Sequence, residues 1–178
     1  MAKVALVAGL AFGFAVAAQL RVPMHPVPMT LQTAAVLAAA LLLGWRLAAG
    51  AVAVYLLAAI AGLPVLSGGG SFAEPGLFGS KTAGYVLGFA PAVWCFERLR
   101  PVTWGRAFVA ASLAHGVVLA LGWSWLATHI GALPAWWHGV VPFALGALAK
   151  SALVASLVRL RRADRAAQPG GDGSRTVR

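Results

Sequence analysis

The chain consists of long apolar runs separated by short polar stretches. Short stretches rich in proline, glycine or charge separate six apolar runs, which cover residues 4–20, 31–43, 47–63, 82–96, 107–127 and 140–160. Runs of about 20 apolar residues are typical of helices that cross a membrane. The pattern therefore predicts an all-α membrane protein with six transmembrane helices. They would form one substrate-binding domain over residues 1–160, followed by a disordered basic tail over residues 161–178.

The first polar stretch, residues 23–33, reads Pro-Met-His-Pro-Val-Pro-Met-Thr-Leu-Gln-Thr. Its prolines fix the backbone φ angle and lack amide hydrogens, so the stretch is not expected to be helical. The helix expected next, residues 31–43, is about 20 Å long, whereas the hydrocarbon core of a membrane is about 30 Å thick. The polar stretch must therefore dip below the membrane surface. Irregular backbone at that depth is tolerated where it lines a cavity, so residues 23–33 are predicted to wall one.

Two further polar stretches are expected to be loops on the same side of the membrane. Residues 66–80 are rich in glycine and predict a flexible loop that acts as a lid. Residues 128–139 contain Trp136 and Trp137 and predict an interfacial loop anchored by aromatic side chains. With residues 23–33, these loops would roof a cavity that is open to the outside and suited to the capture of a solute.

Composition and charge support a membrane protein and argue against other classes. The 178 residues are 61% hydrophobic and 10% charged, whereas soluble domains average about 25% charged residues. The formal net charge is +10, but the basic residues stand at the ends of apolar runs, as in membrane topology rather than nucleic-acid binding. The lone Cys95 offers neither a disulfide nor a metal cluster. No nucleophile and base fall at one depth, so neither enzyme activity nor a cofactor is expected.

The basic residues also predict the orientation of the chain. Cytoplasmic loops of membrane proteins carry an excess of Lys and Arg. With six helices and both termini in the cytoplasm, the outer side holds only Arg21 and Lys81, and Lys150 lies within a helix. The inner side then holds Lys3, Arg46, Arg98, Arg100, Arg106, Arg159, Arg161, Arg162, Arg165, Arg175 and Arg178.

Lys150 and Lys81 are the leading candidates for ligand binding. A charge at mid-membrane costs about 2.5 to 3.5 kcal/mol even on lenient scales, and no Asp or Glu stands within the six apolar helices proper. An anionic ligand is therefore a plausible partner. The alternatives are that Lys150 bonds helix-end carbonyls and that Lys81 reaches water. Thr30, Gln32 and Tyr85 are weaker polar candidates; Thr30 is also a credible helix cap, and Tyr85 also suits an interface.

Small residues recur at every fourth position of the first helix, at Ala5, Gly9, Gly13 and Ala17. Such a stripe lets another helix approach closely. It predicts a docking face, either within the protein or for a partner. Gly84 and Gly88 form a second pair with the same spacing.

Four motifs resemble those of a known family. They are Pro-Val-Pro-Met-Thr-Leu-Gln-Thr from Pro26, Gly-Leu-Pro-Val from Gly62, Thr-Ala-Gly-Tyr-Val-Leu-Gly-Phe from Thr82, and Pro142-Phe143 followed by Gly146 and Lys150. In these motifs the chain resembles the BioY family, the biotin-binding S components of energy-coupling-factor (ECF) vitamin transporters. The resemblance implies a multi-pass subunit in the bacterial inner (cytoplasmic) membrane. It would capture biotin with high affinity and work with a transmembrane coupling protein and ATPase subunits, docking through the first helix.

Two positions depart from the family pattern. Ala147 stands where the family usually has an Asp, so an expected acceptor for the N–H groups of the biotin urea is missing. Lys81 is an added charge at the cavity rim. We expect Lys150 to hold the biotin carboxylate, with Lys81 as the next candidate. An S component for another small anionic vitamin, or a membrane scaffold without a ligand, are the alternatives.

Overall fold

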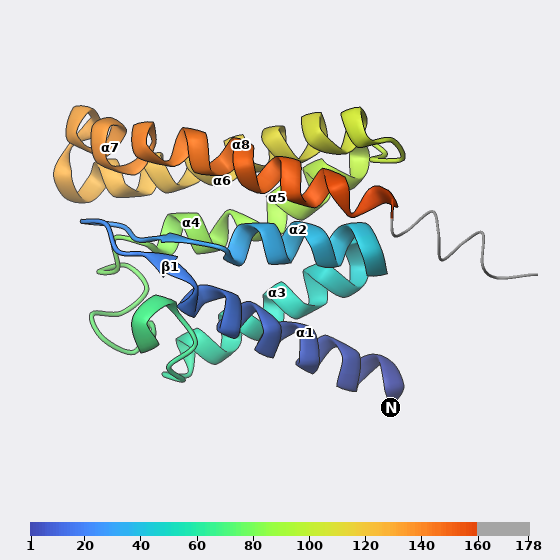
Figure 1. Cartoon of the computed structure of the whole chain (residues 1–178). Coiled ribbons are helices and arrows are strands. Elements are labelled where there is room, and N and C mark those ends of the chain that lie inside the picture. The colour runs from blue at the N-terminus through green and yellow to red at the C-terminus, as the bar shows by residue number, and fades with distance from the viewer. Residues whose placement is uncertain (160–178) are drawn as a thin grey trace, which may run out of the picture.

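The computed structural model describes residues 1–159, which form a bundle of helices running roughly along one long axis (Figure 1). The prediction of a mostly helical chain is confirmed, whereas the predicted tail, residues 161–178, lies outside the described residues. Two short strands, β1 (Arg21–Val22) and β2 (Met29–Thr30), and a 3-10 turn, η1 (Ser67–Gly69), accompany the helices. The helices are α1 (Ala2–Gln19), α2 (Gln32–Leu43), α3 (Trp45–Ile60), α4 (Ala83–Leu87), α5 (Phe89–Arg98), α6 (Trp104–Ile130), α7 (Ala132–Gly139) and α8 (Val141–Ser156).

The bundle has two groups of helices with α2 between them. In one group α6 contacts α4, α5, α7 and α8, and in the other α1 contacts α3. Helix α2 touches both groups, because it packs against α1 and α3 as well as α5 and α8, and α3 also contacts α5 directly. This places the start of α2, directly after the proline-rich stretch, in the middle of the molecule.

The proline-rich stretch is a small β-hairpin, which the sequence did not predict. Arg21 pairs with Thr30 and Val22 with Met29 in antiparallel register, and the prolines stand in the turn region between the strands. The hairpin lies at the end of the bundle opposite the N terminus, together with the η1 loop and the α6–α7 turn (Figure 1). The expectation of a non-helical connector is thereby confirmed. The helix that follows, α2, has 12 residues, so it is as short as expected.

The apolar run over residues 82–96 is two helices rather than one. Helix α4 ends at Leu87 and α5 begins at Phe89, with Gly88 between them. Pro91 lacks the amide hydrogen that would pair with the Leu87 carbonyl, which accounts for the break. Gly84 and Gly88 are a close-packing pair, as predicted. A Cβ atom at Gly84 would collide with Trp125 on α6, and one at Gly88 would lie 3.1 Å from the Cα of Val118.

The prediction of a loop over residues 128–139 is wrong. Helix α6 continues to Ile130, and the following residues form α7. Gly131 has a φ of 87°, which turns the chain between the two helices. Pro134 falls in the first turn of α7, where the amide hydrogens have no partner within the helix, so the proline is tolerated there. The side chains of Trp136 and Trp137 are nevertheless exposed, as expected of interfacial anchors.

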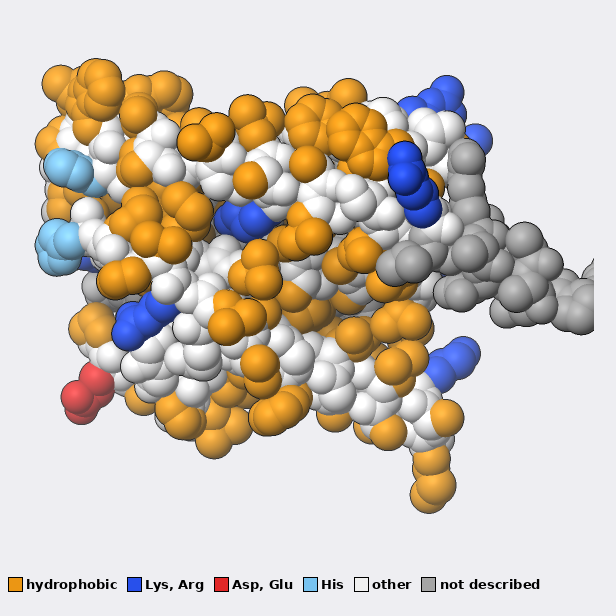
Figure 2. Space-filling view, viewed as in Figure 1, with side chains coloured by type: hydrophobic (Ala, Val, Ile, Leu, Met, Phe, Trp, Pro, Cys, Tyr) orange, Lys and Arg blue, Asp and Glu red, His pale blue; other side chains and the backbone are white. Residues whose placement is uncertain are grey.

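The surface between the two ends of the bundle is apolar, which is typical of a protein that lies in a membrane. Figure 2 shows hydrophobic side chains across the visible face, with several Lys and Arg at the end of the bundle that carries the N terminus and others in the middle and at the opposite end. Three described stretches are long and apolar enough to span a bilayer: Ala2–Gln19, Trp104–Ile130 and Ala132–Ser156. Helices α2 and α3 are apolar but shorter.

Candidate functional site

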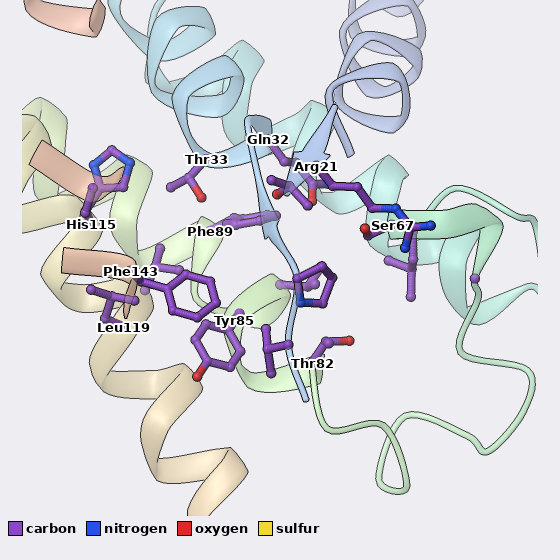
Figure 3. A pocket seen from close by; sticks show the side chains of 18 of the residues that line it. Arg21, Gln32, Thr33, Ser67, Thr82, Tyr85, Phe89, His115, Leu119 and Phe143 are labelled. Atoms are coloured by element: carbon purple, nitrogen blue, oxygen red, sulfur yellow. The ribbon is translucent and has the colours of Figure 1, made fainter. Parts of the chain in front are cut away.

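A cavity of about 310 Å³ lies between the hairpin, the η1 loop and helices α2, α4, α5, α6 and α8 (Figure 3). Val27, Pro28 and Thr30 of the hairpin segment line it, which confirms that the proline-rich stretch walls a cavity. The η1 loop contributes Leu66, Ser67, Gly70 and Ser71. The cavity therefore has two of its three expected roof segments. Residues 128–139, which are helical, contribute none of its described lining.

The floor of the cavity includes the first residues of α2. Gln32 is 4% exposed, and its side-chain amide is buried beside the hydroxyl of Tyr55 on α3. Thr33 lies beside it and is also buried. Gln32 was predicted from sequence, and the structure places it in the cavity.

Lys150 enters the cavity from α8, where it is the tenth residue of the helix. Its Nζ donates a hydrogen bond to the backbone carbonyl of Thr30, 3.2 Å away. An ammonium group has three donors, so this contact leaves two for a ligand. Thr30 also lines the cavity, but it does not cap α2. The N-cap residue is Leu31, and no side chain caps that helix end.

The second cation that lines the cavity is Arg21, not Lys81. Arg21 belongs to β1, and its guanidinium lies against the Gly68 turn of the η1 loop. Lys81 is exposed and stands between Ser80 and Thr82, which line the cavity although Lys81 does not. The described residues of the lining thus include two cations, Arg21 and Lys150, and no carboxylate. Sequence reasoning overlooked Arg21 because it directly follows an apolar helix, where a basic residue is ordinarily read as a topology signal.

Aromatic side chains form an apolar wall opposite the polar groups. Tyr85 on α4 stacks against Phe143 on α8, with ring centroids 6.0 Å apart, and Phe89 lies nearby in the cavity (Figure 3). The Tyr85 hydroxyl donates to the carbonyl of Gly139 at 2.9 Å, so its ring faces the cavity while its hydroxyl serves packing. Phe89 and Phe143 were not singled out from sequence, although both stand in the motifs that carry the family resemblance.

The small-residue stripe of α1 faces away from the rest of the protein over most of its length. Ala5, Gly9 and Gly13 are exposed, and only Ala17 is buried. A Cβ atom added at Gly9 or Gly13 would meet nothing within 4 Å. These glycines therefore do not serve close packing within the chain, which leaves the stripe free for a partner.

Known proteins with similar sequences also indicate the BioY family. The sequence model of the BioY family matches residues 1–167. A "Probable biotin transporter BioY" of Pyrococcus horikoshii is 34% identical over 152 residues, which are 84% of this chain and 90% of that protein. A "Biotin transporter BioY" of Rhizobium etli is 41% identical over 118 residues, 60% of this chain and 62% of that protein.

A solved structure shares the fold. The crystal structure of the S-component for biotin from an ECF-type ABC transporter superposes with a TM-score of 0.77 at 25% identity, covering 94% of this chain and 92% of the other. Each of these relatives is named as a transporter or transporter component rather than as an enzyme, which confirms that expectation. The resemblance seen in the sequence motifs is confirmed as well, and this chain belongs to the BioY family.

Proposed function

We propose that this chain is a biotin-capturing S component of an ECF-type transporter. The observation that carries the proposal is the lining of the cavity, whose described residues include two cations, no carboxylate, the buried amide of Gln32 and an aromatic wall. Biotin is a fused bicyclic urea with a thioether and a short chain that ends in a carboxylate. Its apolar ring edges suit the wall formed by Tyr85, Phe89 and Phe143. Its urea and carboxylate oxygens suit the donors of Gln32, Lys150 and Arg21.

The dimensions of the cavity support a small ligand. A volume of about 310 Å³ is at the lower end of the range for pockets that enclose small molecules. Thr30, Gln32, Tyr85 and Lys150 remain the proposed contacts among the sequence candidates. Lys81 is a weaker candidate, because its exposed side chain does not line the cavity.

Transport would require partners that supply energy. We propose that a transmembrane coupling protein docks on the stripe of Ala5, Gly9, Gly13 and Ala17, and that separate ATPase subunits drive the cycle. We further propose six membrane crossings in a bacterial cytoplasmic membrane, with both termini inside. Two arrangements support this: α1 exposes most of its small residues, and several basic residues lie at the end of the bundle that carries the N terminus (Figure 2).

Calorimetric titration of the purified protein with biotin tests the proposal. We expect saturable one-to-one binding of biotin. Titration with pantothenate or lipoate, two other small carboxylates, should give no heat of binding. Gln32→Leu should weaken biotin binding, because it removes a buried donor. His138→Gln, an exposed position outside the cavity, is the matched control and should change nothing. Binding of another vitamin in place of biotin would point to a different S component, and no binding of any of them would point to a scaffold.

A further inference from the structure

His115 is a buried side chain of the cavity that the proposed contacts do not yet use. It lies on α6 and is 3% exposed. Its ring Nδ1 lies 2.8 Å from the carbonyl oxygen of Ala111 on the same helix. A carbonyl oxygen only accepts hydrogen bonds, so Nδ1 carries the ring hydrogen.

Ser151 on α8 supports the same assignment. Its hydroxyl donates to the carbonyl of Ala147 at 2.8 Å, so the oxygen presents a lone pair to His115 Nδ1, 3.1 Å away. The ring hydrogen on Nδ1 thus has two acceptors. In the neutral ring the other nitrogen, Nε2, then has a lone pair and no hydrogen.

This Nε2 lone pair has no partner. The atom is buried, and no group in the described part of the chain forms a hydrogen bond with it. Because Nδ1 is held against the backbone of α6, Nε2 lies on the side of the ring away from that backbone (Figure 3). A second ring hydrogen would add a third cation to a cavity that already holds Arg21 and Lys150 and whose described lining contains no carboxylate. Nε2 is therefore a buried acceptor that lacks a donor.

The two charged side chains of the described lining are donors, so the N–H groups of a ligand must find their acceptors among the uncharged side chains. The lining Ser and Thr hydroxyls and the Gln32 amide oxygen can accept, Ala147 presents only a methyl group, and Nε2 of His115 is a buried acceptor without a partner. We infer that His115 accepts a hydrogen bond from an N–H of the urea of biotin and so fixes the bicyclic head against α6 and α8. The inference rests on the proposed function, and the carboxylate and thioether of biotin cannot make this contact because neither carries a hydrogen at neutral pH.

The inference makes His115 a specificity residue, because it recognises a donor rather than a charge. A urea N–H left facing no acceptor in a buried site is costly, so the side chain at this position should discriminate between ligands with and without that hydrogen. Replacement of the ring by an apolar residue should weaken biotin binding about tenfold or more.

Nitrogen NMR on the native protein provides a test that does not depend on a variant folding. The protein is labelled with [15N]histidine, and the His115→Gln spectrum assigns the signals of His115. We expect Nε2 to resonate as an unprotonated nitrogen without biotin, and to shift to lower frequency, as hydrogen-bonded acceptors do, when biotin is added. An Nε2 signal that stays in place at saturating biotin overturns the inference while the proposed function stands. No biotin binding at all overturns both.

Binding measurements on variants provide the second test. His115→Leu should lose about tenfold or more in affinity for biotin, His115→Gln should recover part of it through its amide oxygen, and His138→Gln should equal the native protein. Biotin methylated at one or the other urea nitrogen is the matched ligand series. One of the two isomers should lose affinity for the native protein and lose much less for His115→Leu. Equal losses of that isomer against both proteins contradict a contact at Nε2.

Discussion

The two charged donors of the described cavity lining stand on different elements, Arg21 on β1 and Lys150 on α8. The proposed acceptor, His115, would set the orientation of a ligand between them. Ser151, which contacts His115, is the neighbour of Lys150 on α8. A carboxylate placed at this side of the cavity would face the lone pair of His115 Nε2, which is unfavourable. A urea fits both groups, since its oxygen accepts from an ammonium group while its nitrogen donates to the ring. We propose that Arg21 then holds the carboxylate, and the expectation that Lys150 holds it is the alternative.

A double-mutant cycle with biotin and biotin amide tests this orientation. Arg21→Gln should weaken biotin binding about tenfold, and it should bind biotin and the uncharged amide almost equally, because the two changes remove the same interaction. Lys150→Ala should weaken both ligands by about ten- to a hundredfold, because it loses a charge-assisted hydrogen bond to the urea. Lys81→Gln, at an exposed position, is the control and should be neutral. Non-additive losses for Lys150 and the amide would return the carboxylate to Lys150.

At the scale of elements, the glycines of the chain serve two opposite purposes. At Gly84 on α4 and Gly122 on α6, neighbouring side chains occupy the space beside the glycine. A Cβ atom at Gly84 would collide with Trp125, and one at Gly122 with the ring of Tyr85. Those of α1, Gly9 and Gly13, have open space beside them. The sequence spacing is alike in the two cases. Only the packed structure shows which glycines are internal and which remain available to another helix.

The exposed stripe of α1 predicts a separation of binding from transport. Gly9→Leu with Gly13→Leu should block close approach of a partner helix, at a cost of about 0.5 to 2 kcal/mol for each contact, and should leave the cavity unchanged. Uptake of radiolabelled biotin by cells that express the whole transporter should fall, while biotin affinity of the purified subunit stays the same. Gly116→Leu, at an exposed glycine of α6 with equal free space, is the matched control. Normal uptake by the double variant would contradict docking on this face.

At the scale of the whole molecule, charge and aromatic side chains mark the two ends of the bundle. Trp45, Trp94 and Trp104 are exposed near one end, where Arg46 lies 5.5 Å from the Trp45 ring and Arg98 lies 4.8 Å from the Trp94 ring. The exposed Trp136 and Trp137 lie near the other end. Aromatic belts of this kind are typical of the two membrane surfaces, and the richly basic end is typical of the cytoplasmic side.

Labelling from outside the cell tests this orientation. In a background in which Ala replaces Cys95, the free cysteine of the described chain, we expect a membrane-impermeant maleimide to modify Glu74→Cys, at an exposed loop position, in intact cells. Ser174→Cys should react only after the membrane is opened. The Cys95→Ala protein itself should stay unlabelled. Modification of Ser174→Cys in intact cells would place the carboxyl terminus outside.

The sequence by itself determined the apolar helices, the non-helical proline-rich stretch and the family. These features depend on local composition, on the missing amide hydrogens of proline and on motifs that are continuous in the chain. It also named Gln32, Thr30, Tyr85 and Lys150, because polar groups beside apolar runs stand out. Tertiary structure alone decided that Arg21 lines the cavity and Lys81 does not, since that depends on how the hairpin and the Gly68 turn come together. It also made an acceptor of His115, because the ring is oriented by Ala111 on its own helix and by Ser151, which is 36 positions away in sequence.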